Sequence, residues 1–318
     1  MSTLVKGLLA LVVVLLLVVG GAYYWLILES GTPPTTYTLD MGEIRRLADS
    51  MQGAKPVAIR AAHVAPVSFP GNAVLAGDGW APVPMEIFAY KVAFADGSSA
   101  LIDTGLTQRG AAQMQVTADD AAVQNVRGAI KYASLIVVTH EHGDHIGGLL
   151  GFVFLHAEME SGRVKLNAEQ VANLERYNPG YHAEAFVGYR PLTYDKYLAV
   201  APGMVLIRAP GHTPGSQMVY VKTASGEEYL FTGDVAWTMR NIDLVRERAR
   251  LMTWWYLDGE DRAAVLSELA ALNALKKAEP RLHIVPGHDL SVVTGLETAG
   301  ALKKGFDDIA ADNTLPNP

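Results

Sequence analysis

The stretch LIVVTHEHGDHIGG, residues 135–148, decides the fold of this chain. It opens with five residues of buried-strand character, 135–139, and then presents four side chains that bind metals well: His140, His142, Asp144 and His145. Alternate side chains of an extended chain point to the same face, so His140 and His142 can reach one metal ion. A turn after His142 can direct the last two side chains toward a second ion. The stretch therefore predicts a metal centre where a strand ends.

Three later segments repeat this pattern on a smaller scale. Each is a strand-like run followed by a glycine-containing turn that carries one further metal-binding side chain: His212 after 205–208, Asp234 after 229–231 and His288 after 282–285. Side chains at strand ends can project into a shared cleft. We therefore expect these three residues to join the first four.

The rest of the domain alternates strand-like and helical runs. Further strands are expected at 87–94, 100–102 and 217–221. Asn167 is expected to cap a helix that runs to Tyr177, and Asp261 to cap a helix over Arg262–Lys277. This alternation predicts an α/β fold.

With these residues in place, the chain resembles the metallo-β-lactamase superfamily over roughly residues 60–295. The resemblance implies an αββα sandwich with the site at one edge of the packed sheets. It also implies which side chains bind which ion: His140, His142 and His212 bind one, Asp144, His145 and His288 bind the other, and Asp234 lies between them. Asp103, in LIDTG at 101–105, is similar to the family's early Asp, which supports the metal loop from behind the ligands.

The expected cofactors are two divalent metal ions. Zinc is the expected metal, and Fe, Mn and Co are also compatible with His and Asp ligands. Two ions ~3.5–4 Å apart can share a hydroxide that attacks a carbonyl carbon. Asp144 is predicted to be the catalytic residue, because it can orient this nucleophile or move a proton in addition to binding metal. These features predict a metal-dependent hydrolase of a small-molecule substrate.

Branches of the family differ at a few positions. The chain contains no cysteine, and Asp234 stands where Cys-dependent β-lactamases place a thiolate. The motifs PGHTPG at 210–215, GD at 233–234 and GHD at 287–289 resemble the lactonase-type branch, which includes N-acyl homoserine lactonases. The resemblance implies a lactone or ester substrate. A glyoxalase II-like thioesterase and a mononuclear-iron persulfide dioxygenase are the alternatives, ahead of a non-catalytic binding module or a true β-lactamase.

Three side chains are candidates for substrate contacts. Trp237 stands where the lactonases usually have a Tyr, and its indole N–H can donate a hydrogen bond but cannot act as an acid. His182 lies in the segment between ligand motifs, and Trp254 belongs to the aromatic cluster 254–256. Glu141, within the first motif, is expected to face solvent because of the alternation of an extended chain.

The N-terminus predicts a membrane anchor. Residues 4–28 are apolar except for Lys6 and three glycines, and a helix of that length crosses a ~30 Å hydrocarbon core. The alternative is a signal peptide cleaved near 20–22, which would release a secreted protein. Lys6 before the span favours a cytoplasmic N-terminus and an extracytoplasmic domain. The expected divisions are an anchor at 1–29, a Pro/Thr linker at 30–36 that holds the domain off the membrane, and one domain at 37–318.

Composition excludes some classes of function. The formal net charge of −7 disfavours a nucleic-acid binder, which usually carries a basic patch that matches phosphate charge. The mean hydropathy of +0.15 is high for a wholly soluble chain, and the N-terminal span accounts for it. The expected partners are thus a small-molecule substrate and a membrane. The sequence makes no prediction of oligomeric state.

Overall fold

The computed structural model describes residues 2–34, 36–152 and 154–306. Within this part, eleven strands form two sheets that pack face to face. The end of the predicted domain, residues 307–318, lies outside the described residues.

The first sheet has six strands in the order β11 (Lys303–Lys304), β1 (Pro56–Pro70), β2 (Pro82–Phe94), β3 (Ser99–Ile102), β4 (Leu135–Val137) and β5 (Val164–Lys165). The second has five, in the order β10 (His283–Val285), β9 (Glu228–Phe231), β8 (Gln217–Lys222), β7 (Met204–Arg208) and β6 (Tyr197–Ala201). In the first sheet, β4 leads into the first metal motif and pairs in parallel with β3. In the second sheet, β10 leads into the last metal motif and pairs in parallel with β9. Neighbouring motifs therefore leave the sheet at the same edge.

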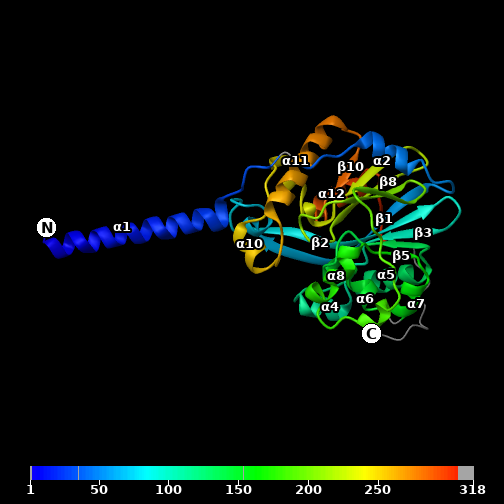
Figure 1. Ribbon diagram of the computed structural model, residues 1–318, viewed down its shortest axis with the longest axis horizontal. Helices are drawn as coiled ribbons and strands as arrows, with labels where there is room; N and C mark the ends of the chain where they lie inside the picture. Colours follow the sequence, from blue (N-terminus) through cyan, green and yellow to red (C-terminus); the bar gives the residue numbers. More distant parts are fainter. Residues whose placement is uncertain (1, 35, 153, 307–318) are drawn as a thin grey trace.

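Helices cover both outer faces, so the layers follow the order αββα (Figure 1). The helices beside the first sheet are α4 (Gln108–Gln113), α5 (Asp120–Tyr132), α6 (Gly143–Leu150), α7 (Leu155–Glu160), α8 (Ala168–Tyr177) and the 3₁₀ turn η2 (Ala183–Phe186). The second sheet is covered mainly by α2 (Met41–Ala48) and α11 (Arg262–Ala278). The remaining short helices are α3 (Gly71–Val74), η3 (Gly233–Val235), α9 (Met239–Leu244), α10 (Arg250–Trp255) and α12 (Leu290–Thr298). This arrangement confirms the predicted sandwich.

Apolar side chains hold the layers together. Between the sheets, side chains such as Ile59, Tyr90 and Phe231 are buried and pack with one another. A second cluster lies between the first sheet and its helices, and a third between the second sheet and α11. The caps predicted for two helices are confirmed: Asn167 accepts from Gln170 N in a capping box, and Asp261 accepts from Ala263 N and Ala264 N.

The N-terminal segment forms one projecting helix. α1 (Thr3–Tyr23) continues as the π-helical turn η1 (Tyr24–Leu28), and α1 extends away from the domain (Figure 1). Thr3–Leu28 is long and apolar enough to cross a membrane, and its most apolar window has none of its residues buried. These properties suit either a membrane anchor or a signal sequence.

The predicted linker is not a free spacer. Gly31 N donates to Glu247 Oε1 over 3.4 Å, and Ser267 Oγ, on α11, donates to Pro34 O over 2.5 Å. Ile27, just before the linker, is buried. Residues 30–34 therefore lie along the domain and bond to it, whereas the sequence predicted a solvated spacer.

One glycine decides how closely the metal loop packs on the first sheet. A Cβ atom added to Gly148, on α6, would lie 2.2 Å from the backbone oxygen of Thr104. Gly148→Ala should therefore lower the free energy of unfolding by about 1–3 kcal/mol, because backbone has to shift. Chemical unfolding of the purified full chain, followed by tryptophan fluorescence, measures this change.

Gly295→Ala is the matched control. Gly295 lies on α12 with open space around its Cβ position, so the substitution should stabilise the helix by up to about 1 kcal/mol. Equal effects of the two substitutions would contradict the packing argument.

Candidate metal centre

The seven predicted ligands meet at one edge of the two sheets. His140 and His142 follow β4, Asp144 and His145 lie in the first turn of α6, and the other three follow β7, β9 and β10. Extended structure ends at Val137, two residues earlier than predicted. The first motif is therefore a loop that leads into a helix.

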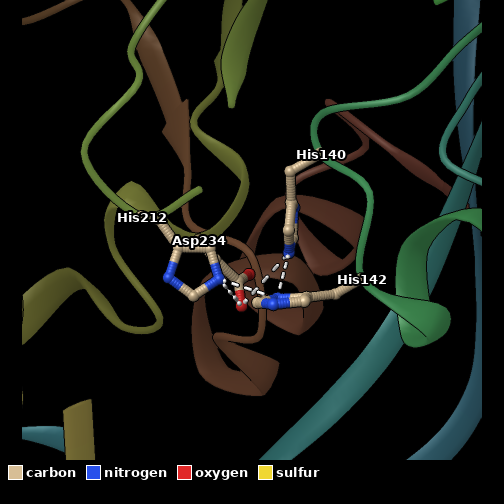
Figure 2. Close-up of side chains that lie close together, drawn as sticks. All are labelled: His140, His142, His212 and Asp234. Atoms are coloured by element: carbon tan, nitrogen blue, oxygen red, sulfur yellow. Dashed lines mark hydrogen bonds and ion pairs between the residues drawn. The ribbon is translucent and has the colours of Figure 1, made fainter. Parts of the chain in front are cut away.

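The side chains of His140, His142, His212 and Asp234, from three segments of the chain, point toward one another (Figure 2). His142 Nδ1 lies 3.1 Å from His140 Nε2 and 3.0 Å from His212 Nε2. Asp234 Oδ2 lies 3.8 Å from His140 Nε2 and 3.5 Å from His212 Nε2. The four ligand atoms lie within 4.8 Å of one another, a spacing that can hold a metal ion.

A second set lies beside the first. His145 Nε2 and His288 Nε2 are 3.3 Å apart, and Asp144 Oδ2 lies 3.8 Å from the former and 3.6 Å from the latter. Asp234 Oδ1 lies 3.2 Å from His145 Nε2 and 3.1 Å from His288 Nε2. Asp234 Oδ1 thus faces the second set, while Oδ2 faces the first set and also lies 3.3 Å from His288 Nε2.

The outer nitrogens of these imidazoles have partners of their own. His145 Nδ1 pairs with Asp103 Oδ2 at 2.9 Å, and His288 Nδ1 pairs with Glu86 O at 2.9 Å. Asp103 also accepts from Thr139 N at 2.6 Å, so it ties the loop to the sheet. Such bonds fix the ring and leave the inner nitrogen free to bind a metal. Asp103 lies where the sequence predicted, behind the ligands.

No motif in the sequence indicates the partner of His212. Its Nδ1 lies 2.7 Å from Glu260 Oε2, and both side chains are fully buried. Arg248, also buried, donates to Glu260 through Nε over 3.0 Å and through Nη2. Burial raises the pKa of Glu260, but Arg248 and His212 outweigh it and hold that pKa below its usual value. Glu260 and Arg248 lie in loops without a motif, so only the tertiary structure identifies them.

Glu141 corrects another expectation. The residue is buried, and it accepts from Thr213 Oγ1 over 2.8 Å and from Gly215 N over 3.2 Å. Burial raises its pKa to about 7. The prediction of a solvent-facing Glu141 was wrong because the chain is no longer extended at this point. Its carboxyl group instead joins the first motif to the turn that carries His212.

The chemistry of the donors fits divalent metals. Burial lowers the pKa values of His140 and His142 well below their usual value, so both rings are neutral and carry a lone pair. Although burial opposes it, His288, His145 and His140 hold the pKa of Asp234 well below its usual value. Asp234 Oδ1 is buried and makes no hydrogen bond of regular geometry, although His145 Nε2 and His288 Nε2 lie 3.2 Å and 3.1 Å from it. A cation between the two sets would satisfy this oxygen.

The donors open into a cavity of about 730 Å³. Asp144, Trp237 and His182 lie in its wall together with Phe69, Tyr177 and Tyr256. Trp237 Nε1 donates to Asp234 Oδ2 over 2.6 Å, so the indole N–H is engaged by the metal-binding carboxylate. His182 lies at the rim, where its exposed ring pairs with Glu184 over 3.0 Å.

Trp254 does not belong to this site. Its side chain is absent from the cavity wall and packs edge-on against Trp25, with ring centroids 6.2 Å apart. The prediction that it contacts substrate is corrected, because α10 turns Trp254 outward. Tyr256, two residues later, is the member of the cluster that reaches the cavity.

Comparison with known proteins agrees with this geometry. Residues 84–288 match the family model of the metallo-beta-lactamase superfamily. An N-acyl homoserine lactonase from Bacillus thuringiensis is 26% identical over 161 residues, which cover 49% of this chain and 55% of that protein. The chain thus spans about half the length of this curated relative.

Two solved structures show the same fold. A quorum-quenching N-acyl homoserine lactone lactonase has a TM-score of 0.57 and 19% identity, over 78% of this chain and 96% of that one. An N-acyl homoserine lactone hydrolase, with the product N-hexanoyl-L-homoserine bound at its catalytic metal centre, has a TM-score of 0.57 and 18% identity, over 77% and 97%.

Asp103→Asn tests the role of the partner behind His145. Asp103 has a φ of 59°, a left-handed conformation that Asn also adopts readily, so the backbone should be retained. The lost carboxylate should weaken metal binding by about 10–100-fold, as is typical when such a partner is removed. Competition with a chelating dye measures the affinity.

Glu227→Gln is the control, since the exposed Glu227 pairs with His283 at 3.1 Å, away from the metal ligands. Unchanged affinity in Asp103→Asn would show that Asp103 does not support the metal loop.

Proposed function

The chain belongs to the metallo-β-lactamase superfamily, and on this premise we propose that it is a membrane-anchored hydrolase that uses two metal ions on a lactone or ester. The family match and the buried His/Asp cluster together identify a metal-dependent hydrolase. The position of Asp234 between two complete donor sets is the observation that carries the two-ion proposal.

The proposed ligands are those of the two sets. One ion would be held by His140, His142 and His212, the other by Asp144, His145 and His288, with Asp234 shared. Two bound divalent ions polarise a carbonyl oxygen and lower the pKa of a water molecule toward neutrality. Zinc suits this donor set, as do Fe, Mn and Co.

The chain's own residues supply positioning and proton transfer. Asp144 lies in the cavity wall with Oδ2 3.6 Å from His288 Nε2, and we assign it the proton that passes from the attacking water to the leaving oxygen. Trp237 holds Asp234 through its indole N–H, which makes it a positioning residue. His182, at the rim, is retained as a proposed substrate contact.

Two observations support a lactone or ester substrate. The curated relative reported above is an N-acyl homoserine lactonase. The cavity wall combines apolar side chains such as Phe69 and Leu257 with the polar metal donors, as an acylated substrate would require. The second donor set favours this reaction over a dioxygenase with a single iron, which would leave that set without a role.

We further propose that Thr3–Leu28 is an uncleaved, single-pass anchor with the domain on the extracytoplasmic side. The span is apolar from Gly7 onward, and aromatic residues at 23–25 mark its domain-proximal end, where such rings favour a membrane boundary. Gly20 and Gly21, at the alternative cleavage site, lie inside the continuous helix α1.

The direct test is metal quantification together with a substrate panel. The full chain, purified in detergent and loaded with zinc, should hold about two ions and hydrolyse a lactone or an ester. Chelation should lower the rate by on the order of 100-fold or more, and added zinc should restore it. Lactones, esters, thioesters, phosphodiesters and β-lactams form the panel.

Asp234→Ala should abolish the activity and lower the metal content, because it removes a donor from both sets. Asp243→Ala is the matched control, since Asp243 forms an exposed pair with Lys276 at 2.5 Å. Full activity in the chelated protein, or one iron per chain with oxygen consumption on a thiol substrate, would refute the proposal.

A further inference from the structure

Four aromatic side chains are exposed where the N-terminal helix meets the domain. Tyr24 and Trp25 belong to η1, while Trp254 and Trp255 belong to α10, which lies beside the base of α1 (Figure 1). Trp254 is 70% exposed and Trp255 is 85% exposed. We call these four residues the aromatic patch. Exposed tryptophans that gather on one face mark a surface that contacts another phase or molecule.

The length of the helix indicates the level at which the aromatic patch would lie in a bilayer. A bilayer core of ~30 Å needs about 20 helical residues, which the apolar run from Leu4 to Tyr23 provides. Trp25 then lies at the boundary between hydrocarbon and headgroups, the level that Trp and Tyr prefer. Trp254 packs edge-on against Trp25, at 6.2 Å between ring centroids, so it lies at the same level.

The junction between helix and domain is braced. Gly77 N donates to the carbonyl oxygen of Ile27 over 3.0 Å, and Ile27 is buried. Arg250, at the start of α10, pairs with Glu29 at 2.6 Å and stacks its guanidinium on the Trp25 ring at 4.7 Å. These contacts fix α10 relative to the span, so a helix that crosses a bilayer brings α10 to the bilayer surface.

A chain of aromatic contacts links the patch to the metal centre. Tyr256 directly follows Trp255 and lies in the cavity wall. Its ring contacts Phe69 at 5.5 Å, and Phe69 contacts Trp237 at 5.4 Å. One side of the cavity therefore adjoins the patch.

We propose that the aromatic patch inserts into the surface of the bilayer that α1 spans, so that the side of the cavity beside Tyr256 faces the lipid. This rests on the anchor in the proposed function and adds its consequence for the substrate. An acylated lactone or ester dissolved in the bilayer would then reach the cavity along the membrane surface, with its acyl chain in apolar surroundings.

The chain's lack of cysteine gives a site-specific test. Trp255→Cys in the full chain provides a single thiol for an environment-sensitive fluorophore. The control is Val57→Cys, an exposed apolar position (53%) near the start of β1, about 40 Å along that strand from its Pro70 end. Both proteins are reconstituted in phosphatidylcholine/phosphatidylglycerol nanodiscs that hold one copy each, with and without doxyl-labelled lipid.

The label at position 255 should be quenched by doxyl lipid at least about threefold more than the label at position 57, as expected for a residue in the headgroup region. Equal, weak quenching at both positions would overturn the inference. Weak quenching at position 255, with a label emission that shifts only in nanodiscs holding two copies, would assign the patch to a second copy of the chain and would also overturn it.

An activity measurement tests whether the substrate reaches the cavity from the membrane. Trp254→Ser with Trp255→Ser should raise KM for a long-chain acyl lactone presented in vesicles by about tenfold, since membrane contact concentrates that substrate. It should leave kcat and KM for a short-chain, water-soluble lactone unchanged. An unchanged KM for both substrates would refute access from the membrane.

The two proposals fail in different ways. If no lactone or ester is hydrolysed but the quenching contrast is present, the proposed reaction is wrong and membrane insertion stands. If a lactone or ester is hydrolysed but the two labels are quenched equally, membrane insertion is wrong and the proposed reaction stands.

Discussion

The site depends on one buried carboxylate. Asp234 is 4% exposed and lies between two groups of imidazoles, which follow strand ends of both sheets. A charged carboxylate is costly to bury unless cations or donors surround it. The sandwich provides them by bringing the ends of β4, β7, β9 and β10 to one edge. Trp237 adds a hydrogen bond, so the residue that departs from the lactonase pattern helps to hold this carboxylate.

Much of the site could be predicted because its signals are local. The sequence contains four segments in which a strand is followed by a turn with a metal-binding side chain. Asn167 and Asp261 cap their helices as expected. Other features depend on tertiary contacts. β1 (Pro56–Pro70) was missed, because its prolines, alanines and His63 do not form a regular apolar alternation, and its pairing with β2 stabilises it. Glu260 gains its role from meeting Arg248 and His212, which no spacing in the sequence indicates.

The corrections concern side chains whose direction is set by tertiary contacts. Glu141 was expected outside the site because the alternation of an extended chain was assumed to continue, and Trp254 was expected inside it because it belongs to an aromatic cluster. Instead, the loop after Val137 turns Glu141 toward Thr213, and α10 turns Trp254 toward Trp25. The linker likewise bonds to Glu247 and Ser267 instead of extending into solvent. The contacts of Trp254 and of the linker thus place the N-terminal helix, the aromatic patch and the cavity next to one another.

The most direct test of the two-ion centre is a crystal structure of the zinc-loaded chain with anomalous diffraction at the zinc edge. We expect two peaks: one among His140, His142 and His212, and one among Asp144, His145 and His288, with Asp234 between them. A single peak within one set, with the other set empty, would contradict the two-ion centre.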